Sequence, residues 1–239
     1  MSVLRLPRIA EFRGWLDLNG PLFGPALYLF ESVRSYIEER KEAFDARFGT
    51  DTAAPVFGRR DRAPGAYFYV ATTASLIYEI LNSLALQPDT FAFVDMGSGK
   101  GRALLVASEF AFAKIVGIEL LPQLHRIAQE NIQRYSPASQ PCTAFELHCM
   151  NVVDYTYGKE PVVLFLFDPF GRETLRSVIA NLEASLRTNP REVYVVYVYP
   201  QFEDVLQSSR VFQRIREGGP PLRPWSRYVV YAASAAGPV

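Results

Sequence analysis

The chain of 239 residues has few of the residues that build disulfide frameworks and metal sites. Its two cysteines, Cys142 and Cys149, are too few for a disulfide framework, and a reduced compartment is the default expectation. The two histidines, His125 and His148, make no spacing with these cysteines that is typical of a metal site. No G-x-S-x-G sequence follows a predicted strand, which leaves a serine hydrolase unsupported. We therefore expect no metal ion and no nucleophilic hydrolase chemistry.

A surplus of charge of either sign is also missing, because 25 lysines and arginines balance 25 aspartates and glutamates. Extended nucleic acids are normally bound through clustered surplus basic residues, so nucleic acid is a less expected partner. No apolar run approaches the ~20 residues that cross a bilayer, and the run Val162–Phe167 has the length of a strand. The N-terminus has no apolar stretch of the kind found in secretory signals. These absences predict a cytoplasmic protein with no membrane partner.

The pattern of apolar residues changes near Phe91. Residues 1–88 are expected to form an N-terminal helical or lid region, with a helix over 27–48 that stops at Gly49 and a second helix from Thr72 or Thr73 onward. In residues 89–239, the second domain, short apolar runs alternate with helical stretches. Strands are expected at 91–96, 114–119, 144–150, 161–167 and 192–199, more weakly at 211–215 and 227–232, and helices at 103–110, 122–135 and 174–186. This alternation predicts an α/β fold with a mostly parallel sheet covered by helices, whose ligands bind beyond the carboxyl ends of the strands.

A glycine turn, Asp95-Met-Gly-Ser-Gly-Lys-Gly101, ends the first strand and opens a helix. A P-loop requires glycine where this chain has Val94, and serine or threonine where it has Gly101. A dinucleotide fingerprint has its third glycine at the position of Arg102, which weakens that interpretation. The turn closely resembles the G-x-G-x-G loop of class I S-adenosylmethionine-dependent methyltransferases, which implies that Asp95 helps to hold the cofactor ammonium, directly or through water. We also expect backbone N–H groups to receive the cofactor carboxylate, with Gly97, Ser98, Gly99 and Gly101 as the binding residues of the loop.

Two further strand ends carry residues that suit the same cofactor. Glu119 ends the second strand, where a carboxylate can accept hydrogen bonds from both ribose hydroxyls, a device that dinucleotide enzymes share. Leu120 is then expected under the adenine. After the third strand, Asn151 and Val152 occupy the place where methyltransferases usually bind the adenine amino group. A plain turn-forming role for Asn151 is the alternative.

The sequence Asp168-Pro-Phe-Gly171 follows the fourth strand. It resembles the Asp/Asn-Pro-Pro-Tyr/Phe motif of methyltransferases that act on amino groups, although it has one proline in place of two. The resemblance implies that Asp168 contacts both the cofactor and the target nitrogen, and that Pro169 and Phe170 contact the substrate, with the ring facing positive charge. The alternative is a turn that caps the next helix.

An aromatic cluster, Tyr67-Phe68-Tyr69, precedes the cofactor strand. It is expected either to cover the cofactor and line the substrate site or to anchor the N-terminal region on the sheet. Tyr69 is the second candidate for orienting the target amine, and Thr72 is a candidate for substrate binding.

Most of the chain, from about Phe44 to Tyr231, resembles a bacterial family of class I methyltransferases and, more distantly, the non-SET histone-lysine methyltransferases. The matching stretches include 44–49, 94–102, 117–120, 168–171 and 193–197. The family usually has Tyr-x-Pro-Thr where this chain has Tyr69-Val-Ala-Thr72. The resemblance implies a Rossmann-like sheet with an antiparallel last strand, helices on both faces and an N-terminal helical extension.

The function expected from these features is methyl transfer from S-adenosylmethionine to an amino nitrogen, of a protein lysine or of a small amine. One alternative is a module that binds S-adenosylmethionine without turnover. A nicotinamide-dependent oxidoreductase is the other, and the glycine spacing disfavours it.

Overall fold

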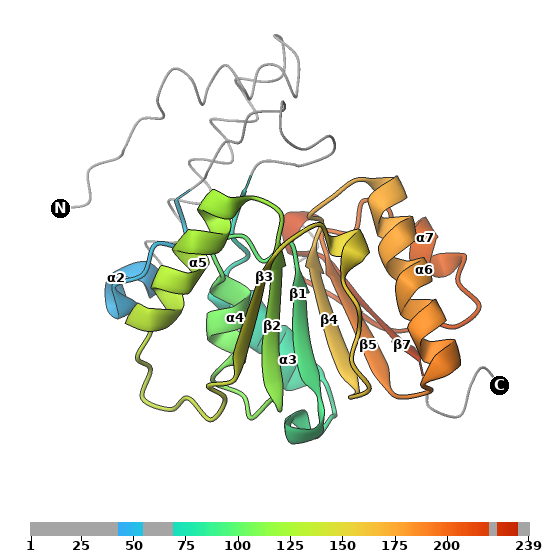
Figure 1. Cartoon of the computed structure of the whole chain (residues 1–239), viewed down its shortest axis with the longest axis horizontal. Coiled ribbons are helices and arrows are strands. Elements are labelled where there is room, and N and C mark those ends of the chain that lie inside the picture. Colours follow the sequence, from blue (N-terminus) through green and yellow to red (C-terminus); the bar gives the residue numbers. More distant parts are fainter. Residues whose placement is uncertain (1–42, 55–68, 220–223, 234–239) are drawn as a thin grey trace, which may run out of the picture.

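A seven-stranded sheet forms the centre of the computed structural model, which describes residues 43–54, 69–219 and 224–233 (Figure 1). The strands lie in the order β3-β2-β1-β4-β5-β7-β6. Their bounds are β1 Ala92–Met96, β2 Lys114–Glu119, β3 Phe145–Cys149, β4 Val162–Phe167, β5 Val193–Val198, β6 Gln213–Gly218 and β7 Tyr228–Ala233. β1 to β5 run parallel, whereas β7 is antiparallel to both β5 and β6. This arrangement confirms the predicted α/β fold and its antiparallel last strand.

The chain changes direction across the sheet between β1 and β4. From β1 it proceeds outward to β2 and β3, and then returns to the other side of β1 to form β4. Such a switch point leaves a crevice beyond the carboxyl ends of the two diverging strands, where ligands of α/β proteins bind. The glycine turn and the Asp168 motif both begin at this switch point, at the ends of β1 and β4.

Both faces of the sheet are covered, as the unbroken apolar strands require. On one face, Phe93, Ile115 and Phe165 pack with the helices α2 and α3 and with α4. On the other face, Val116 and Leu164 pack with α6 and α7. The helix bounds are α2 Phe44–Phe48, α3 Ala74–Ser83, α4 Arg102–Ala107, α5 Pro122–Arg134, α6 Arg172–Thr188 and α7 Asp204–Gln207, with single 3-10 turns η2 Pro88–Thr90, η3 Val152–Asp154 and η4 Pro224–Ser226.

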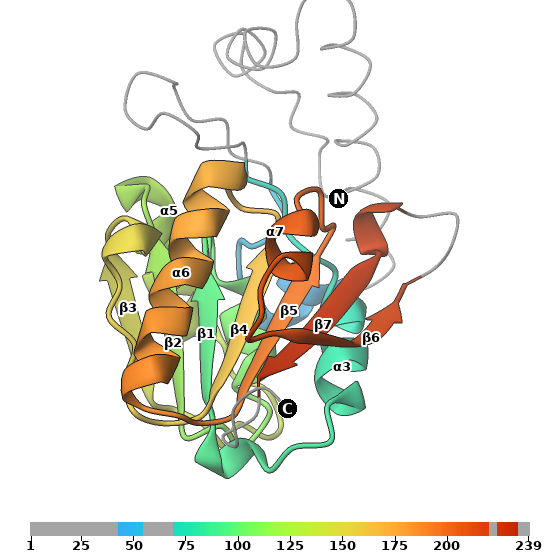
Figure 2. The same cartoon turned by 90° about the vertical axis from the view of Figure 1, so that its right-hand side faces the viewer.

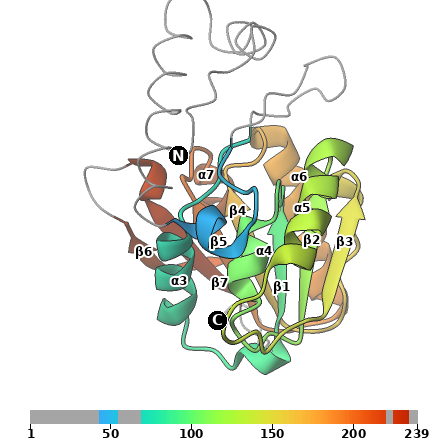
Figure 3. The same ribbon diagram turned by 90° about the vertical axis from the view of Figure 1, so that its left-hand side faces the viewer.

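The described parts of the N-terminal region pack into the same core as the sheet. α2 ends at Phe48, and the residue after it is Gly49, the predicted stop, with a φ of +68°. A Cβ atom at Gly49 would meet no atom within 4 Å, so the positive φ is the reason for glycine here. Phe44 of α2 stacks on Tyr135 at the end of α5, with ring centroids 5.7 Å apart. α3 begins directly after Thr73, as predicted, and lies beside β7 and β6 in Figures 2 and 3, where the Tyr228 hydroxyl donates to Glu79.

Two predicted elements differ from the structure at their ends. The helix after the glycine turn ends at Ala107, before the predicted end at Phe110. The strand expected at 211–215 begins at Gln213 and continues to Gly218, and its side chains are almost all exposed. Because its side chains are exposed and mostly charged, this edge strand lacks the apolar alternation from which the bounds of a strand are predicted. Most of the predicted helix 27–48, together with Tyr67 and Phe68, lies outside the described residues.

Candidate active site

The glycine turn after β1 has a backbone that requires its glycines. Gly97, Gly99 and Gly101 have φ angles of +86°, +54° and +87°, in the left-handed region. A Cβ atom on Gly97 would lie 2.5 Å from Cβ of Pro169, and one on Gly99 would lie 2.2 Å from Cε2 of Tyr69. The loop after β4 and the ring of Tyr69 therefore both press on the turn, and neither position has room for a side chain.

Four N–H groups of the turn are bonded within the chain. The N–H groups of Gly97 and Ser98 donate to the Ile118 carbonyl at 2.8 and 2.9 Å, and that of Gly101 donates to the Ser98 carbonyl at 2.8 Å. The Gly99 N–H donates to Oε2 of Glu119 at 2.8 Å. These bonds tie the end of β1 to the end of β2 and fix the turn. The carboxylate of a ligand would have to be received by other donors at this edge, which refines the expectation from the sequence.

Glu119 is buried at the end of β2 with both carboxylate oxygens oriented. Oε2 accepts from Gly99, and Oε1 accepts from the Leu121 N–H at 2.8 Å. Burial raises the pKa of Glu119, although these backbone N–H groups act in the opposite direction. Each oxygen keeps a second lone pair. The geometry fits the predicted bond to two neighbouring ribose hydroxyls.

Asp95 is the most unusual group at this edge, because its carboxylate is buried without a hydrogen-bond donor among the described residues. It is 4% exposed. Burial and the nearby negative charge of Glu119 raise its pKa to about 8. A cationic ligand group would remove this cost, whereas the pyrophosphate of a dinucleotide would add charge of the wrong sign beside two carboxylates. S-adenosylmethionine carries an ammonium and a sulfonium, so the residues present fit it better than they fit a nicotinamide cofactor.

Tyr69 and Thr72 lie in the segment that leads into α3. The Tyr69 hydroxyl donates to the Thr52 carbonyl at 2.7 Å, and burial raises the pKa of this hydroxyl above its ordinary value. The hydroxyl is thus bonded to the chain, and the ring of Tyr69 is the part that covers Gly99. The Thr72 hydroxyl, in contrast, is buried without a partner among the described residues, which marks it as available to a ligand.

The expected adenine residues differ in exposure. Leu120 is 39% exposed and Val152 is 8% exposed. Asn151 is exposed, and its Oδ1 atom accepts from the Val153 N–H at 3.3 Å, which caps η3. The turn role weighed for Asn151 is therefore present in the structure, and its bond to the adenine amino group stays a prediction.

Asp168 lies beyond β4 in a strained backbone conformation, with a φ of +35°. Its Oδ1 atom accepts from the Tyr197 hydroxyl at 2.5 Å, and Oδ2 accepts from the Gln201 amide at 2.7 Å. Burial raises the pKa of Asp168 in spite of these two donors. The next residue, Pro169, contacts Gly97, which brings the Asp168 motif against the glycine turn.

Phe170 does not face the crevice freely. It is 7% exposed and belongs to the apolar core between the sheet and α6. A ring packed by the chain's own side chains presents little of its face to a substrate cation, so the structure does not favour the predicted contact of Phe170 with the substrate.

The sequence pattern did not identify several residues that hold the site. Tyr197 lies within an apolar strand and Gln201 in a turn, and neither has a motif. Lys100 of the glycine turn and Arg102, the first residue of α4, have no motif either, yet they are 1% and 5% exposed and bonded to the segment 43–54. The signal in the sequence that could have indicated them is the presence of two cationic residues in the glycine-rich stretch after β1. Among residues 43–54, 69–219 and 224–233, no group of histidine, cysteine or acidic side chains is arranged to hold a metal ion.

Comparisons with known proteins agree with this geometry. The family model "Histone methylation protein DOT1" matches residues 61–157, which is the region of α3, the glycine turn and Glu119. No curated protein matches the chain significantly. No helix in the described ranges is long and apolar enough to cross a membrane.

Solved structures share the fold at low sequence identity. A protein from Pseudomonas syringae that has been assigned as a methyltransferase is 14% identical, with a TM-score of 0.50 over 67% of this chain and 96% of that one. A ribosomal protein L11 methylase from Lactobacillus delbrueckii subsp. bulgaricus is 18% identical, with a TM-score of 0.46 over 68% of this chain and 78% of that one.

Proposed function

We propose that this chain is a class I S-adenosylmethionine-dependent methyltransferase that transfers the methyl group of its cofactor to an amino nitrogen. The acceptor is a protein lysine or a small amine. The observation that carries the proposal is the position of Asp168, whose neighbour Pro169 contacts Gly97 of the cofactor turn. A half-buried carboxylate beside the cofactor turn suits an acceptor that carries N–H donors.

The bonds that the cofactor residues make, or lack, support the roles that we propose for them. Asp95 has no donor in the described part of the chain and would pair with the cofactor ammonium, and Glu119 would accept from the ribose hydroxyls. Thr72 offers a buried hydroxyl without a partner. When bound, S-adenosylmethionine supplies a methyl group activated by its sulfonium. The work of these residues is to fix the donor in one orientation, which lowers the entropic part of the barrier.

The acceptor side acts through orientation and exclusion of water. Tyr197 and Gln201 each donate to one oxygen of Asp168, so the carboxylate is held before a substrate arrives. Its remaining lone pairs would accept from the target nitrogen and steady the positive charge that develops there. A lysine must be neutral to react, and burial beside the crevice favours the neutral form.

Two features weigh against other acceptors. The formal net charge of zero gives no broad basic field for an extended nucleic acid. The carboxylates of Asp95, Glu119 and Asp168 lie at the carboxyl ends of β1, β2 and β4, and they suit a donor-rich amine better than an acidic or phosphorylated substrate.

The test is methyl transfer from labelled S-adenosylmethionine to a cell extract by the full chain. Fractions treated with protease or nuclease, and a small-molecule fraction, are followed by mass spectrometry. Label on a lysine or another amine supports the proposal. Label on oxygen, carbon or nucleic acid contradicts it. Binding of S-adenosylhomocysteine with no transfer to any fraction would favour the alternative, a module that binds the cofactor without turnover.

A further inference from the structure

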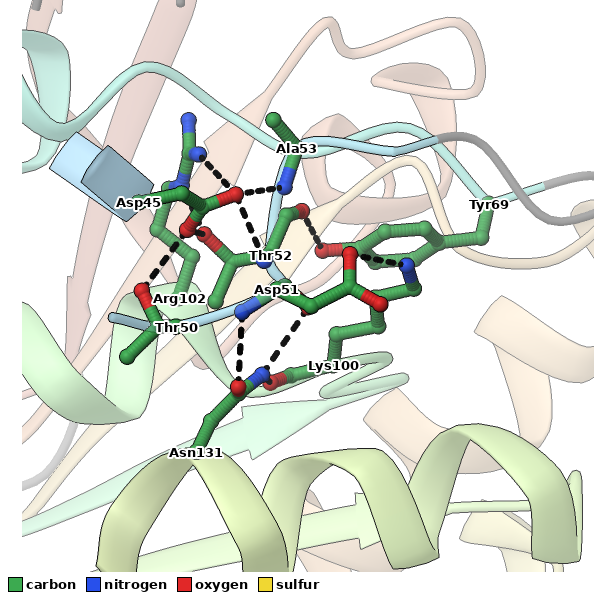
Figure 4. Close-up of polar contacts among 9 residues, drawn as sticks. All are labelled: Asp45, Thr50, Asp51, Thr52, Ala53, Tyr69, Lys100, Arg102 and Asn131. Carbon is green, nitrogen blue, oxygen red and sulfur yellow. Dashed lines mark hydrogen bonds and ion pairs between the residues drawn. The ribbon is translucent and has the colours of Figure 1, made fainter. Parts of the chain in front are cut away.

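Two cationic side chains at the glycine turn, Lys100 and Arg102, are buried. Burial of a charged side chain is rare and costly unless the charge is paired. Nζ of Lys100 lies 2.8 Å from Oδ1 of Asp51. Nε of Arg102 donates to Oγ1 of Thr52 at 2.6 Å, and its guanidinium lies 3.6 Å from Asp45. These partners belong to residues 43–54, which we call the anchor segment (Figure 4). Lys100 of the turn and Arg102, the first residue of α4, are thus held by a segment about fifty positions earlier in the chain.

Asp45 organises the anchor segment. Its Oδ1 atom accepts from the hydroxyls of Thr50 and Thr52 at 2.7 and 2.6 Å, and Oδ2 accepts from the N–H groups of Thr52 and Ala53 at 2.8 and 2.7 Å. Burial acts to raise the pKa of Asp45, but these bonds and the charge of Arg102 hold the pKa below its ordinary value. The carboxylate is therefore ionised at neutral pH, and the Thr52 hydroxyl bridges it to Arg102.

Asn131 joins the anchor segment to the backbone of the turn. This residue of α5 is fully buried. Its Oδ1 atom accepts from the Asp51 N–H at 2.8 Å, while Nδ2 donates to the carbonyls of Asp51 and Lys100 at 3.0 and 2.9 Å. The Tyr69 hydroxyl adds a bond to the Thr52 carbonyl, with its ring on Gly99. Figure 4 shows these groups converging on one short stretch of backbone.

A glycine-rich turn loses more conformational freedom on ordering than other backbone does. A ligand that must order such a turn loses affinity, and a turn ordered in advance avoids that loss. The anchor segment is bonded to the side chains of Lys100 and Arg102, and Glu119 at the end of β2 accepts a hydrogen bond from the Gly99 N–H. None of the anchor residues Asp45, Asp51 and Thr52 is among those assigned to the cofactor.

We propose that the anchor segment is a positioning element for the cofactor site, and that Thr52, Asp45 and Asp51 set cofactor affinity by holding the glycine turn in its binding conformation. This inference rests on the proposed function, because it assumes that S-adenosylmethionine binds at the turn. The competing explanation is that the contacts stabilise the fold alone.

The main experiment compares Thr52→Val with Thr52→Ser in the full chain. Valine keeps the shape of the fully buried side chain and removes the hydroxyl that joins Asp45 to Arg102, whereas serine keeps the hydroxyl. In the absence of ligand, we expect amide hydrogen exchange at 99–101 to be at least ~10-fold faster in the valine variant. We expect S-adenosylhomocysteine, measured by calorimetry, to bind ~5-fold or more weakly. The serine variant is expected to stay within ~2-fold of the wild type in both measurements.

A second pair of variants guards against loss of folding. Asp51→Asn removes the charge opposite Lys100 on a side chain that is 48% exposed. Its matched control, Glu160→Gln, removes the charge that lies 2.6 Å from Lys114, at the amino end of the sheet. We expect Asp51→Asn to weaken binding ~3-fold and to speed exchange at 99–101, and the control to change stability alone.

The outcomes separate this inference from the proposed function. If the wild type does not bind S-adenosylhomocysteine, the proposed function fails, while exchange at 99–101 still decides whether the segment holds the turn. Unchanged exchange in both Thr52→Val and Asp51→Asn overturns the inference. Faster exchange together with wild-type affinity also overturns the inference, because the anchor segment would then hold the turn without affecting cofactor binding.

Discussion

The carboxyl edge of the sheet has two halves that are built differently. At the ends of β1 and β2, Asp95 and Glu119 are 4% and 6% exposed. Four N–H groups of the glycine turn are hydrogen-bonded within the chain. At the ends of β4 and β5, Asp168 and Tyr199 are partly exposed and have positive φ angles of 35° and 52°. The first half is buried, carries two carboxylates and is held by hydrogen bonds, whereas the second half is more exposed and has strained backbone.

The difference matches the demands of the two substrates of a methyltransferase. One cofactor binds in every turnover, so a site ordered in advance gains affinity without loss of generality. The acceptor must enter and leave with its nitrogen aligned, and strained backbone at such positions is typical of functional sites. Substitutions in the first half should therefore change cofactor affinity, and substitutions in the second half should change turnover.

The largest effect is expected from Asp168→Ala. It removes the carboxylate that we propose orients the acceptor, so kcat should fall by ~10²-fold or more, the scale for a lost positioned electrostatic contact. The affinity for S-adenosylhomocysteine should be nearly unchanged, measured by calorimetry on the same preparation. Asp204→Ala, an exposed acid paired with Arg172, is the control. Wild-type turnover in Asp168→Ala would return the motif to a helix-capping turn.

Glu119→Ala is expected to have the next largest effect, and in the opposite half. Loss of the oriented carboxylate should weaken cofactor binding by ~1.5–3 kcal/mol, the typical value for hydrogen bonds to a charged group. The variant also frees the Gly99 N–H, which is bonded to Oε2. Glu146→Ala, on the neighbouring strand β3, should bind the cofactor normally. Equal affinity in the two variants would argue against the ribose role.

The sequence predicted the parts of the molecule whose signals are local. The strand β4 is an unbroken apolar run and the turn at Gly97 has glycines at fixed spacing, so both could be located from the order of residues alone. Glu119 and Asp168 could be found because each directly follows a strand. Gly49 was identified as a helix stop for the same kind of reason, its freedom to adopt a positive φ.

What the sequence could not supply are partnerships between distant residues. Tyr197 has the same appearance as the other aromatic residues of β5, and only the register that sets Leu166 opposite Tyr197 brings its hydroxyl to Asp168. The pairing of Arg102 with Thr52 spans fifty positions. Asn131 is a polar residue in an amphipathic helix and would be taken for an exposed one, yet it is fully buried. Such contacts depend on tertiary packing and have no local pattern.

The electrostatics of the first half predict a pH dependence of about tenfold per unit. Asp95 has a pKa of about 8 in the folded protein, against an ordinary value of 3.8. The folded state without ligand therefore holds the proton more tightly than the unfolded state, and its stability should fall as pH rises from about 4 towards 8. Pairing with the cofactor ammonium requires the ionised form.

Binding of S-adenosylhomocysteine should therefore release a proton, and its affinity should rise by up to about tenfold per pH unit between pH 6 and 7.5. Calorimetry in buffers of different ionisation enthalpy measures both quantities. In Asp95→Asn the affinity should be lower and no longer depend on pH in this range. An affinity of the wild type that is constant over the same range would separate Asp95 from the ammonium.

The smallest effect is expected from Tyr197→Phe, and it tests whether the second half is held as the structure indicates. The substitution conserves volume at a fully buried position and removes the hydroxyl that donates to Oδ1 of Asp168 at 2.5 Å. Because this donor lowers the pKa of Asp168, its loss should raise that pKa further. The ionised form accepts from the amine, so the acid limb of the kcat profile should move to higher pH, with kcat near neutral pH ~5-fold lower, equivalent to ~1 kcal/mol. Cofactor affinity should be unchanged.

Tyr231→Phe on β7 is the matched control, since its hydroxyl donates to Glu203 and not to a residue of the site. A shift of the acid limb in the control as well, or in neither variant, would show that the Tyr197 hydroxyl does not set the ionisation of Asp168.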